Sequence, residues 1–415
     1  MKLILLPLAL SLCIGLAQAA DLAQQASLER GRYLALLGDC AACHTLDARR
    51  PFAGGVALQS PLGPIYASNI TPDTRNGIGS YSLAQFDNAM RHGIAADGRQ
   101  LYPAMPYPSF ARLTDQDVGD LYTYFLHGVA ADPSENRPPD IVWPLSMRWP
   151  LSWWNSLFAG AQAYQADTGK SAQWNRGAYL VQGLGHCGSC HTPRGLAFQE
   201  KALDQSDGDY LSGGQLAGWY AAALTGNAGD ALRGWTEADL VEFLRNGRNV
   251  HTAAFGPMAE AVAHSTQYFN DEDLEAVAVY LRSLAPATPA APPGADRTSA
   301  TLAQGAPRSP GEQLYLDNCS ACHRSDGQGY ARTFPRLAGN SAVTGQSADS
   351  LIRIILQGGQ VPVTRGAPSG LRMPDFGWRL DDRQVAELSS FLRSAWGYQG
   401  TPVQPEDVAR LRALN

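Results

Sequence analysis

The feature that most constrains this chain is the motif Cys-x-x-Cys-His, which occurs three times along the 415 residues. Six of the seven cysteines belong to these motifs, and the seventh, Cys13, lies in an apolar N-terminal stretch. The copies are far apart, so each is expected to serve its own stretch of folded chain. The motifs comprise Cys40, Cys43 and His44; Cys187, Cys190 and His191; and Cys319, Cys322 and His323.

The motif spacing predicts covalent haem attachment. Two cysteines three residues apart lie on one side of a helical turn, where both thiols can bond to the vinyl groups of one haem. The histidine that follows is placed to bind the iron as proximal ligand. A thioredoxin-type disulfide needs a βαβ setting, a zinc site needs two cysteine pairs at one metal, and a structural disulfide leaves the histidines without a role. The sequence therefore predicts three c-type haems.

Three methionines in small loops beside proline are the predicted second axial ligands, because methionine is the usual partner of histidine in electron-transfer haems. These residues are Met105, Met258 and Met373, one after each motif. The region from Pro307 onward holds one methionine, one histidine and no lysine, so Met373 is the most constrained of the three. Met90 and Met147 are interpreted as packing residues. Histidine ligation in the first two repeats stays open, from His92, His127, His251 or His264.

The same order of helical signals surrounds each motif. A segment with Gly and Tyr precedes the motif, a helix that stops at glycine precedes the methionine, and a periodic helix closes the repeat. No segment shows sustained strand alternation, so we expect an all-α fold built from three tandem units. The closing helices carry apolar residues with spacing i, i+3, i+6 and i+7: Val118, Leu121, Tyr124 and Phe125; Leu274, Val277, Tyr280 and Leu281; and Val385, Leu388, Phe391 and Leu392.

This order of elements resembles class I cytochrome c. Three such units after an export signal resemble the tri-haem cytochrome c subunit of membrane-associated bacterial dehydrogenases for alcohol, gluconate and related sugars or polyols. Shared stretches beyond the motifs include residues 67–73, 102–107, 335–340 and 373–376. Asn69 and Thr71, in the first of these, are candidate donors to a haem propionate. The resemblance covers roughly residues 25 to 398 and does not indicate which substrate is oxidised.

The predicted organisation has seven parts. A signal peptide is indicated by Lys2, an apolar core and a small-x-small site at Ala17–Ala19, with a mature start near Ala20 or Asp21. The parts are a signal peptide at 1–20, cytochrome c domain 1 at 21–131, a Trp-rich connector at 132–170, cytochrome c domain 2 at 171–286, a Pro/Ala linker at 287–306, cytochrome c domain 3 at 307–398, and a polar tail at 399–415.

The Trp-rich connector holds four of the nine tryptophans: Trp143, Trp149, Trp153 and Trp154. It is expected either to pack between the first two domains or to form a membrane-boundary or partner-docking surface, since clustered tryptophan suits a membrane interface. No later window is long and apolar enough to span a bilayer, so any membrane association is expected to be peripheral. We expect the mature protein on the periplasmic face of the cytoplasmic membrane.

The resemblance implies an electron-transfer subunit. Once three cytochrome units are assigned, no catalytic domain remains, and the chain has no room for a flavin-binding fold. Electrons would come from a dehydrogenase subunit with flavin or pyrroloquinoline quinone and leave to ubiquinone or a terminal oxidase. The alternatives are a cytochrome subunit of a molybdenum hydroxylase or aldehyde dehydrogenase, and a multi-haem peroxidase or reductase. A net charge of −6 argues against a nucleic acid partner.

Overall fold

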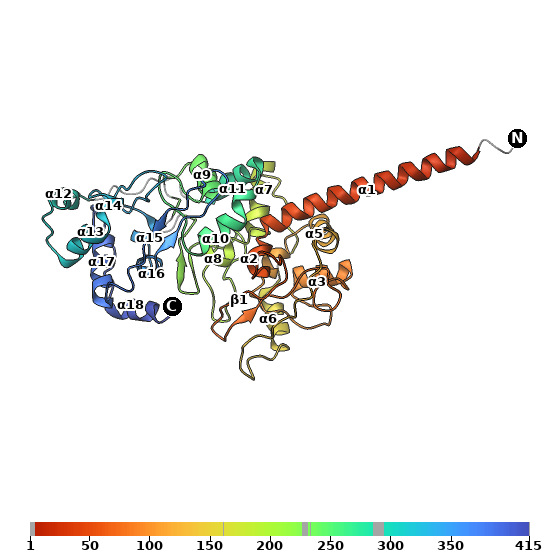
Figure 1. The fold of residues 1–415 in the computed structure, drawn as a ribbon, viewed down its shortest axis with the longest axis horizontal. Helices are drawn as coiled ribbons and strands as arrows, with labels where there is room; N and C mark the ends of the chain where they lie inside the picture. The colour runs from red at the N-terminus through yellow and green to blue at the C-terminus, as the bar shows by residue number, and fades with distance from the viewer. Residues whose placement is uncertain (1–4, 161, 226–230, 233, 285–293, 415) are drawn as a thin grey trace. The chain divides into compact units, whose positions relative to one another are not determined.

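The computed structural model describes residues 5–160, 162–225, 231–232, 234–284 and 294–414. The chain divides into two compact units, Met1–Tyr164 and Gln165–Asn415. The first unit contains the first repeat and most of the Trp-rich connector, and the second contains the second and third repeats together (Figure 1). Within the described ranges the fold is mostly helical, as expected from the sequence.

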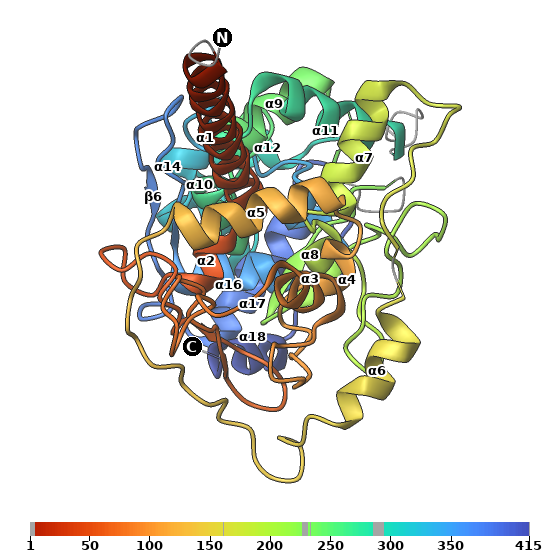
Figure 2. The same cartoon turned by 90° about the vertical axis from the view of Figure 1, so that its right-hand side faces the viewer.

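The first unit is built on two helices that cross, α1 and α5 (Figure 2). The segment predicted as signal core and the first helix of domain 1 form one continuous helix, α1. No helix in the described part of the chain has the length and apolar character needed to cross a membrane. The elements of this unit are α1 (Leu5–Leu37), α2 (Cys40–His44), β1 (Ala57–Leu58), β2 (Ile65–Tyr66), α3 (Leu83–His92), α4 (Tyr107–Phe110), α5 (Asp115–His127) and α6 (Pro150–Phe158).

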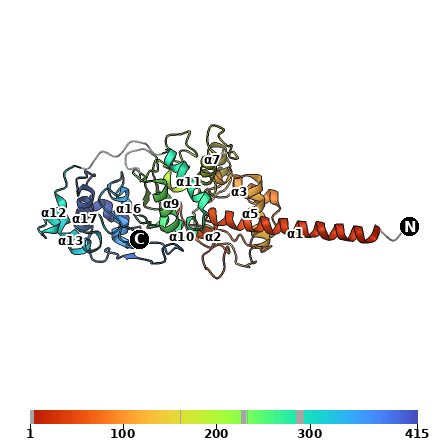
Figure 3. The same cartoon turned by 90° about the horizontal axis from the view of Figure 1, so that it is seen from above.

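The second unit repeats this arrangement twice, with α7 against α11 and α13 against α17 (Figure 3). The elements are α7 (Ala172–Gln182), α8 (Gly188–His191), β3 (Gly214–Leu216), β4 (Trp219–Ala221), α9 (Glu237–Asn246), α10 (Pro257–His264), η1 (Thr266–Tyr268), α11 (Asp271–Leu284), α12 (Thr298–Ala303), α13 (Pro310–Asn318), α14 (Ser320–His323), α15 (Ser341–Thr344), α16 (Asp349–Gln357), β5 (Gly359–Gln360), β6 (Arg372–Met373), α17 (Asp382–Ser394) and α18 (Pro405–Arg412).

Three small antiparallel sheets, each of two strands, lie between the helices of the described ranges. They pair β1 with β2, β3 with β4, and β5 with β6. The sequence did not predict them, because a strand of two or three residues is too short to show an alternating pattern. Each strand has only two or three residues, so the helical architecture stands.

A glycine in the first helix of each repeat explains how closely the first and last helices cross. Any larger residue would meet the backbone of the last helix, so only glycine fits without moving it. The distances from an added Cβ to the facing carbonyl oxygen are 2.0 Å for Gly31 and Asp120, 2.0 Å for Gly177 and Ala276, and 2.5 Å for Gly311 and Glu387. Since each Cys-x-x-Cys-His motif directly follows this first helix, the crossing fixes where the motif begins.

The apolar stripes of the three closing helices are buried as predicted. Eleven of the twelve residues are at most 9% exposed, and Leu121, Leu274, Tyr280 and Val385 are fully buried, whereas Tyr124 is half-buried. The helices before the methionine loops end as expected at glycines with positive φ, which are Gly93, Gly247 and Gly358. The repeat inferred from sequence therefore corresponds to three similar helical cores.

Two segments expected outside the third domain pack against it. The tail at 399–415 was expected to be polar, but it contains α18, whose Val408 and Leu411 are fully buried in the third core. In the linker at 287–306, residues 287–293 lie outside the described ranges, and Leu302 of α12 is buried in the same core. Apolar residues three apart in such short helices are too few for a periodic signal, which is why the sequence did not show them.

Candidate haem sites

Each cysteine pair lies at a short helix that follows the first long helix of its repeat. Both cysteines of the first pair lie within this helix, whereas Cys187 and Cys319 are the N-cap residues before theirs. These helices are α2, α8 and α14, and all six cysteines are free of disulfides. Five of the cysteines are half-buried and Cys322 is exposed. Neither cysteine of a pair is used in a disulfide, as covalent haem attachment requires.

The histidine of each motif is held through its Nδ1 atom by a backbone carbonyl of a later loop. The acceptor is Ser68 O at 2.6 Å for His44, Ala222 O at 2.7 Å for His191, and Pro335 O at 2.9 Å for His323. Because Nδ1 donates this bond, the proton sits there and Nε2 remains the nitrogen that can bind iron. The same hydrogen bond from the histidine to a backbone carbonyl thus occurs in all three repeats.

Burial shifts the pKa values of these groups toward their uncharged forms. Desolvation lowers the pKa of His44, His191 and His323, against a smaller opposite effect of the Nδ1 bond. Desolvation also raises the pKa of Cys40, Cys187 and Cys319 to about 12. Each site therefore presents neutral imidazole and uncharged thiol, a donor set suited to an apolar macrocycle whose iron takes a neutral histidine.

The residues around the third motif fit a haem in one further respect. Arg336 follows the carbonyl that holds His323, and its buried Nε atom has no hydrogen-bond partner among the described residues. A buried N–H group without an acceptor is costly, and a haem propionate would supply one. Throughout the described ranges, no three His, Cys, Asp or Glu side chains come together as a set that could hold a metal ion on its own.

The predicted methionine ligands are half-buried residues next to the ends of short elements. Met105 precedes α4, Met258 is the second residue of α10, and Met373 is the last residue of β6. Met373 and Cys319 both pack against the third hydrophobic core, so the structure brings the predicted ligand and the haem motif of that repeat to one cluster. For all three methionines, ligation remains a prediction from position along the repeat.

The competing histidines occupy other environments. His92, His127 and His264 are exposed. His251 stacks on Trp235 with 5.2 Å between ring centroids, and its Nε2 lies 3.3 Å from a carboxylate oxygen of Asp239. The choice between these histidines and the methionines as axial ligands remains a prediction.

Asn69 and Thr71 do not have donors free for a propionate. Both are buried, and the Asn69 amide donates to Asp132 O at 2.8 Å and Ser134 O at 3.0 Å. The Thr71 hydroxyl donates to Asn69 Oδ1 at 2.7 Å. Their role is therefore to hold the start of the Trp-rich connector against domain 1. The sequence around Asn69 resembles a ligand-binding loop. It could not show that the carbonyls of Asp132 and Ser134, more than 60 residues later, accept the Asn69 hydrogen bonds.

The connector helix α6 lies against the loop that carries Met105. Tyr107 donates a 2.5 Å hydrogen bond to Asn155 Oδ1, and Asn155 donates to Gln100 Oε1 at 2.7 Å. Trp154 packs edge-on against Tyr107, with 6.2 Å between centroids. One side of α6 is thereby tied to the first unit.

The other side of α6 is apolar and exposed. Its residues Trp149, Trp153 and Leu157, spaced four apart, are 58%, 67% and 74% exposed. Trp143, before the helix, is 79% exposed. We call Trp149, Trp153 and Leu157 the α6 surface.

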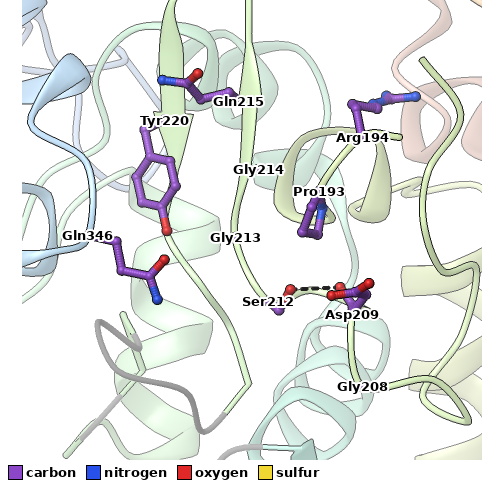
Figure 4. Close-up of a pocket in the computed structure, with 10 residues that line it drawn as sticks. All are labelled: Pro193, Arg194, Gly208, Asp209, Ser212, Gly213, Gly214, Gln215, Tyr220 and Gln346. Carbon is purple, nitrogen blue, oxygen red and sulfur yellow. Dashed lines mark hydrogen bonds between the residues drawn. The ribbon is translucent and has the colours of Figure 1, made fainter. Parts of the chain in front are cut away.

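A polar cavity of about 520 Å³ lies beside the second motif (Figure 4). Pro193 and Arg194, which follow the motif, form part of its wall, and Gln346 lines it from the third domain. Gln215 and Tyr220 of the β3–β4 hairpin also line it. The cavity marks the place where the second haem-binding repeat and the third domain meet.

The backbone acceptors of the three histidines are the functional groups that sequence reasoning missed. A carbonyl oxygen carries no residue signature, so Ser68, Ala222 and Pro335 could not be singled out. Arg336 lies in the stretch 335–340, and the resemblance of that stretch to cytochromes was the available signal.

Comparison with known proteins agrees with this geometry. The sequence profile of the family described as Cytochrome c matches residues 28–128, 174–285 and 309–396. The chain is 47% identical over 405 residues to the gluconate 2-dehydrogenase cytochrome c subunit of Pantoea cypripedii, covering 95% of this chain and 92% of that protein. It is also 47% identical over 405 residues to the cytochrome c subunit of an alcohol dehydrogenase (quinone) of Gluconacetobacter polyoxogenes, covering 96% and 86%.

A third relative extends the range of substrates named. The fructose dehydrogenase cytochrome subunit of Gluconobacter japonicus is 37% identical over 418 residues, covering 94% of this chain and 84% of that protein. The relatives of equal identity carry the names of different dehydrogenases, so similarity alone does not select a substrate.

Proposed function

Because this chain belongs to the cytochrome c family and binds haem c at three motifs, we propose that it is the tri-haem electron-transfer subunit of a dehydrogenase complex. It accepts electrons from a catalytic subunit that uses flavin or pyrroloquinoline quinone to oxidise an alcohol, gluconate or a related sugar or polyol. It delivers them to ubiquinone or a terminal oxidase. The observation that carries the proposal is a site that occurs three times, with two cysteines outside any disulfide and one histidine bound to a backbone carbonyl.

The chain's own residues attach the haem and set its environment. Six cysteines hold the three groups, His44, His191 and His323 present Nε2 to the iron, and we propose Met105, Met258 and Met373 as the opposite ligands. Haem c supplies one-electron redox chemistry at each site. The buried helical cores exclude water around the sites, which helps to fix their potentials.

The relatives support the partner. Their names place them in gluconate, alcohol and fructose dehydrogenases as cytochrome subunits, and they match nearly the whole of this chain. We therefore infer that this chain also works beside a catalytic dehydrogenase subunit.

We place the complex on the periplasmic face of the cytoplasmic membrane. The first 20 residues are proposed as the export signal. The α6 surface is proposed as the membrane-facing part, because tryptophan is suited to the boundary between lipid and water. Its attachment beside the Met105 loop would keep the first haem close to a quinone in the bilayer.

The function can be tested with the complex isolated from membranes through a tag on this chain. Gluconate, ethanol and fructose are added in turn while the haem absorbance is recorded. One of these substrates, or a related polyol, is expected to reduce the haems when the dehydrogenase is present and not when it has been removed. Oxidation of substrate by this chain alone, or a substrate-active complex whose haems stay oxidised, would contradict the proposal.

The membrane role has its own test. Trp149→Ser with Trp153→Ser is expected to weaken binding of the complex to phosphatidylglycerol–phosphatidylethanolamine vesicles and to slow quinone reduction. Trp378→Ser is the matched control, since Trp378 is 79% exposed but belongs to the third domain. Native vesicle binding in the double variant would exclude the α6 surface as the membrane contact.

A further inference from the structure

The β3–β4 hairpin connects the second haem motif with the third domain. Its strands pair Gly214 with Ala221, Gln215 with Tyr220, and Leu216 with Trp219. The turn runs through Ala217 and Gly218, with φ of 49° and 77°, a conformation that matches the twist of the strands.

The base of the hairpin holds His191 at two points. The Gly213 N–H donates to the His191 backbone carbonyl at 2.8 Å, just before β3. The Ala222 carbonyl, just after β4, accepts the 2.7 Å bond from His191 Nδ1. The position of this histidine's ring therefore depends on how the two strands are placed.

Helix α16 of the third domain contacts the turn and the second strand of the hairpin. The Tyr220 N–H donates to Ser350 Oγ at 2.9 Å, and the Ser350 hydroxyl donates back to the Tyr220 carbonyl at 2.9 Å. Arg353 donates to the Ala217 carbonyl, and its guanidinium carbon lies 4.7 Å from the centroid of the Trp219 ring. One face of α16 thus binds both the turn and the second strand.

These contacts are buried, although two of the side chains that make them are charged. Ser350 is 4% exposed, Asp349 7% and Arg353 9%. Asp349 accepts a hydrogen bond from Gln215 of the hairpin and pairs with Arg410 of α18 at 3.0 Å. Burying charged groups is costly unless they are hydrogen-bonded, so the hairpin and α16 stabilise each other.

The same helix also lies against the predicted distal ligand of the third haem. α16 ends at Gly358, where an added Cβ would lie 2.6 Å from the Met373 carbonyl oxygen. Gly359 then pairs with Met373 between β5 and β6. One helix therefore contacts the support of His191 and the strand of Met373.

We propose that Ser350 is a positioning residue for the second haem, acting from the third domain through Tyr220 and Ala222 on the Nδ1 bond of His191. The reduction potential of the second haem then depends on the docking of α16 against the hairpin. This goes beyond the proposed function, since it holds for any electron donor or acceptor and requires only haem attachment at the second motif.

The direction of the effect follows from the chemistry of the ligand. A short Nδ1–H···O bond makes the imidazole a stronger donor to iron, which favours the oxidised state. If the hairpin loosens, this bond weakens and the potential of the second haem rises. Loss of an outer-shell partner commonly changes metal-site properties about tenfold or more, and a tenfold change in a one-electron reduction equilibrium is ~59 mV.

The test is a redox titration of the full chain with all haems bound. Ser350→Ala is expected to raise the potential of the component that disappears in the Cys187→Ala, Cys190→Ala double variant, by up to about tenfold in the reduction equilibrium. Ser389→Ala is the matched control, because this fully buried serine of the third domain has no hydrogen-bond partner for its hydroxyl among the described residues. It should leave that potential unchanged.

Each result decides the proposal. A shift in Ser350→Ala and none in Ser389→Ala supports it, and equal potentials in both variants overturn it. If Ser350→Ala fails to load three haems, Gln215→Ala decides instead, since Gln215 is exposed on the hairpin and contacts Asp349. A smaller shift in the same direction then supports the proposal, and an unchanged potential overturns it.

Discussion

Replacing Gly31 with alanine tests how closely the two long helices of the first unit pack. The new Cβ would lie 2.0 Å from the Asp120 carbonyl oxygen and 2.7 Å from the Tyr124 Cβ. Ordinary contacts of a Cβ begin at 3.4 Å, and a helix backbone cannot turn aside as a flexible side chain can. The helices α1 and α5 must therefore separate locally by about 1.4 Å.

The free energy of unfolding should fall because two opposing effects are unequal. Alanine in a helix is favoured over glycine by about 1 kcal/mol. Overpacking a close contact costs roughly 1–3 kcal/mol, and here the upper end applies because backbone atoms are displaced. The neighbouring Arg30–Asp120 pair, with 2.7 Å between its atoms, would also loosen. We expect a net loss of about 2 kcal/mol.

The assay must be local, because a chain of several domains does not unfold in two states. Hydrogen exchange of the holo protein, read by mass spectrometry on peptides of α1 and α5, reports the opening free energy of this contact. Gly119→Ala is the matched control, since Gly119 lies in α5 with no atom within 4 Å of an added Cβ. It should gain about 0.4–1 kcal/mol. Equal protection in the two variants would refute the close crossing.

Three further predictions use other parts of the chain. Burial alone raises the pKa of the Asp120 carboxyl, but hydrogen bonds, chiefly from Arg30, outweigh burial and hold this pKa below its usual range. The stability that this carboxylate contributes is therefore lost as pH falls through the lowered pKa. Asp120→Asn should cost about 1.5–3 kcal/mol of unfolding free energy at pH 7 and make the melting temperature less dependent on pH on the acid side. Met373→Ala should lower the potential of the third haem by removing an axial thioether, unlike Met147→Ala, as redox titration would show. Asn155→Ala should cost about 1–3 kcal/mol by leaving the Tyr107 hydroxyl unpaired, and limited proteolysis should then cut near α6 sooner.

Much of the architecture could be predicted because the signals are local. The motif fixes a cysteine pair and a histidine on one turn, and a stripe such as Val385, Leu388 and Phe391 needs only its own helix to be recognised. The sequence places Gly31 in a helix. It does not show why only glycine fits there, because the obstructing atom is the backbone carbonyl of Asp120, far along the chain.

The remaining features depend on long-range partners. The hydrogen bond that holds His191 uses a backbone carbonyl, and any residue type at position 222 could have supplied it. Asn69 and Thr71 have donors suited to a ligand, but the fold directs them to the loop near Asp132. Val408 and Leu411 become a core face only when the third domain is present to cover them.

The central claim is that one chain carries three covalent haems, each on its own motif. Intact mass of the mature chain under denaturing conditions, combined with a pyridine haemochrome assay, counts them directly. We expect three haems per chain, and two in the Cys187→Ala, Cys190→Ala double variant with the other two retained. A count of two in the unaltered chain, or haem that is released on denaturation, would contradict the account.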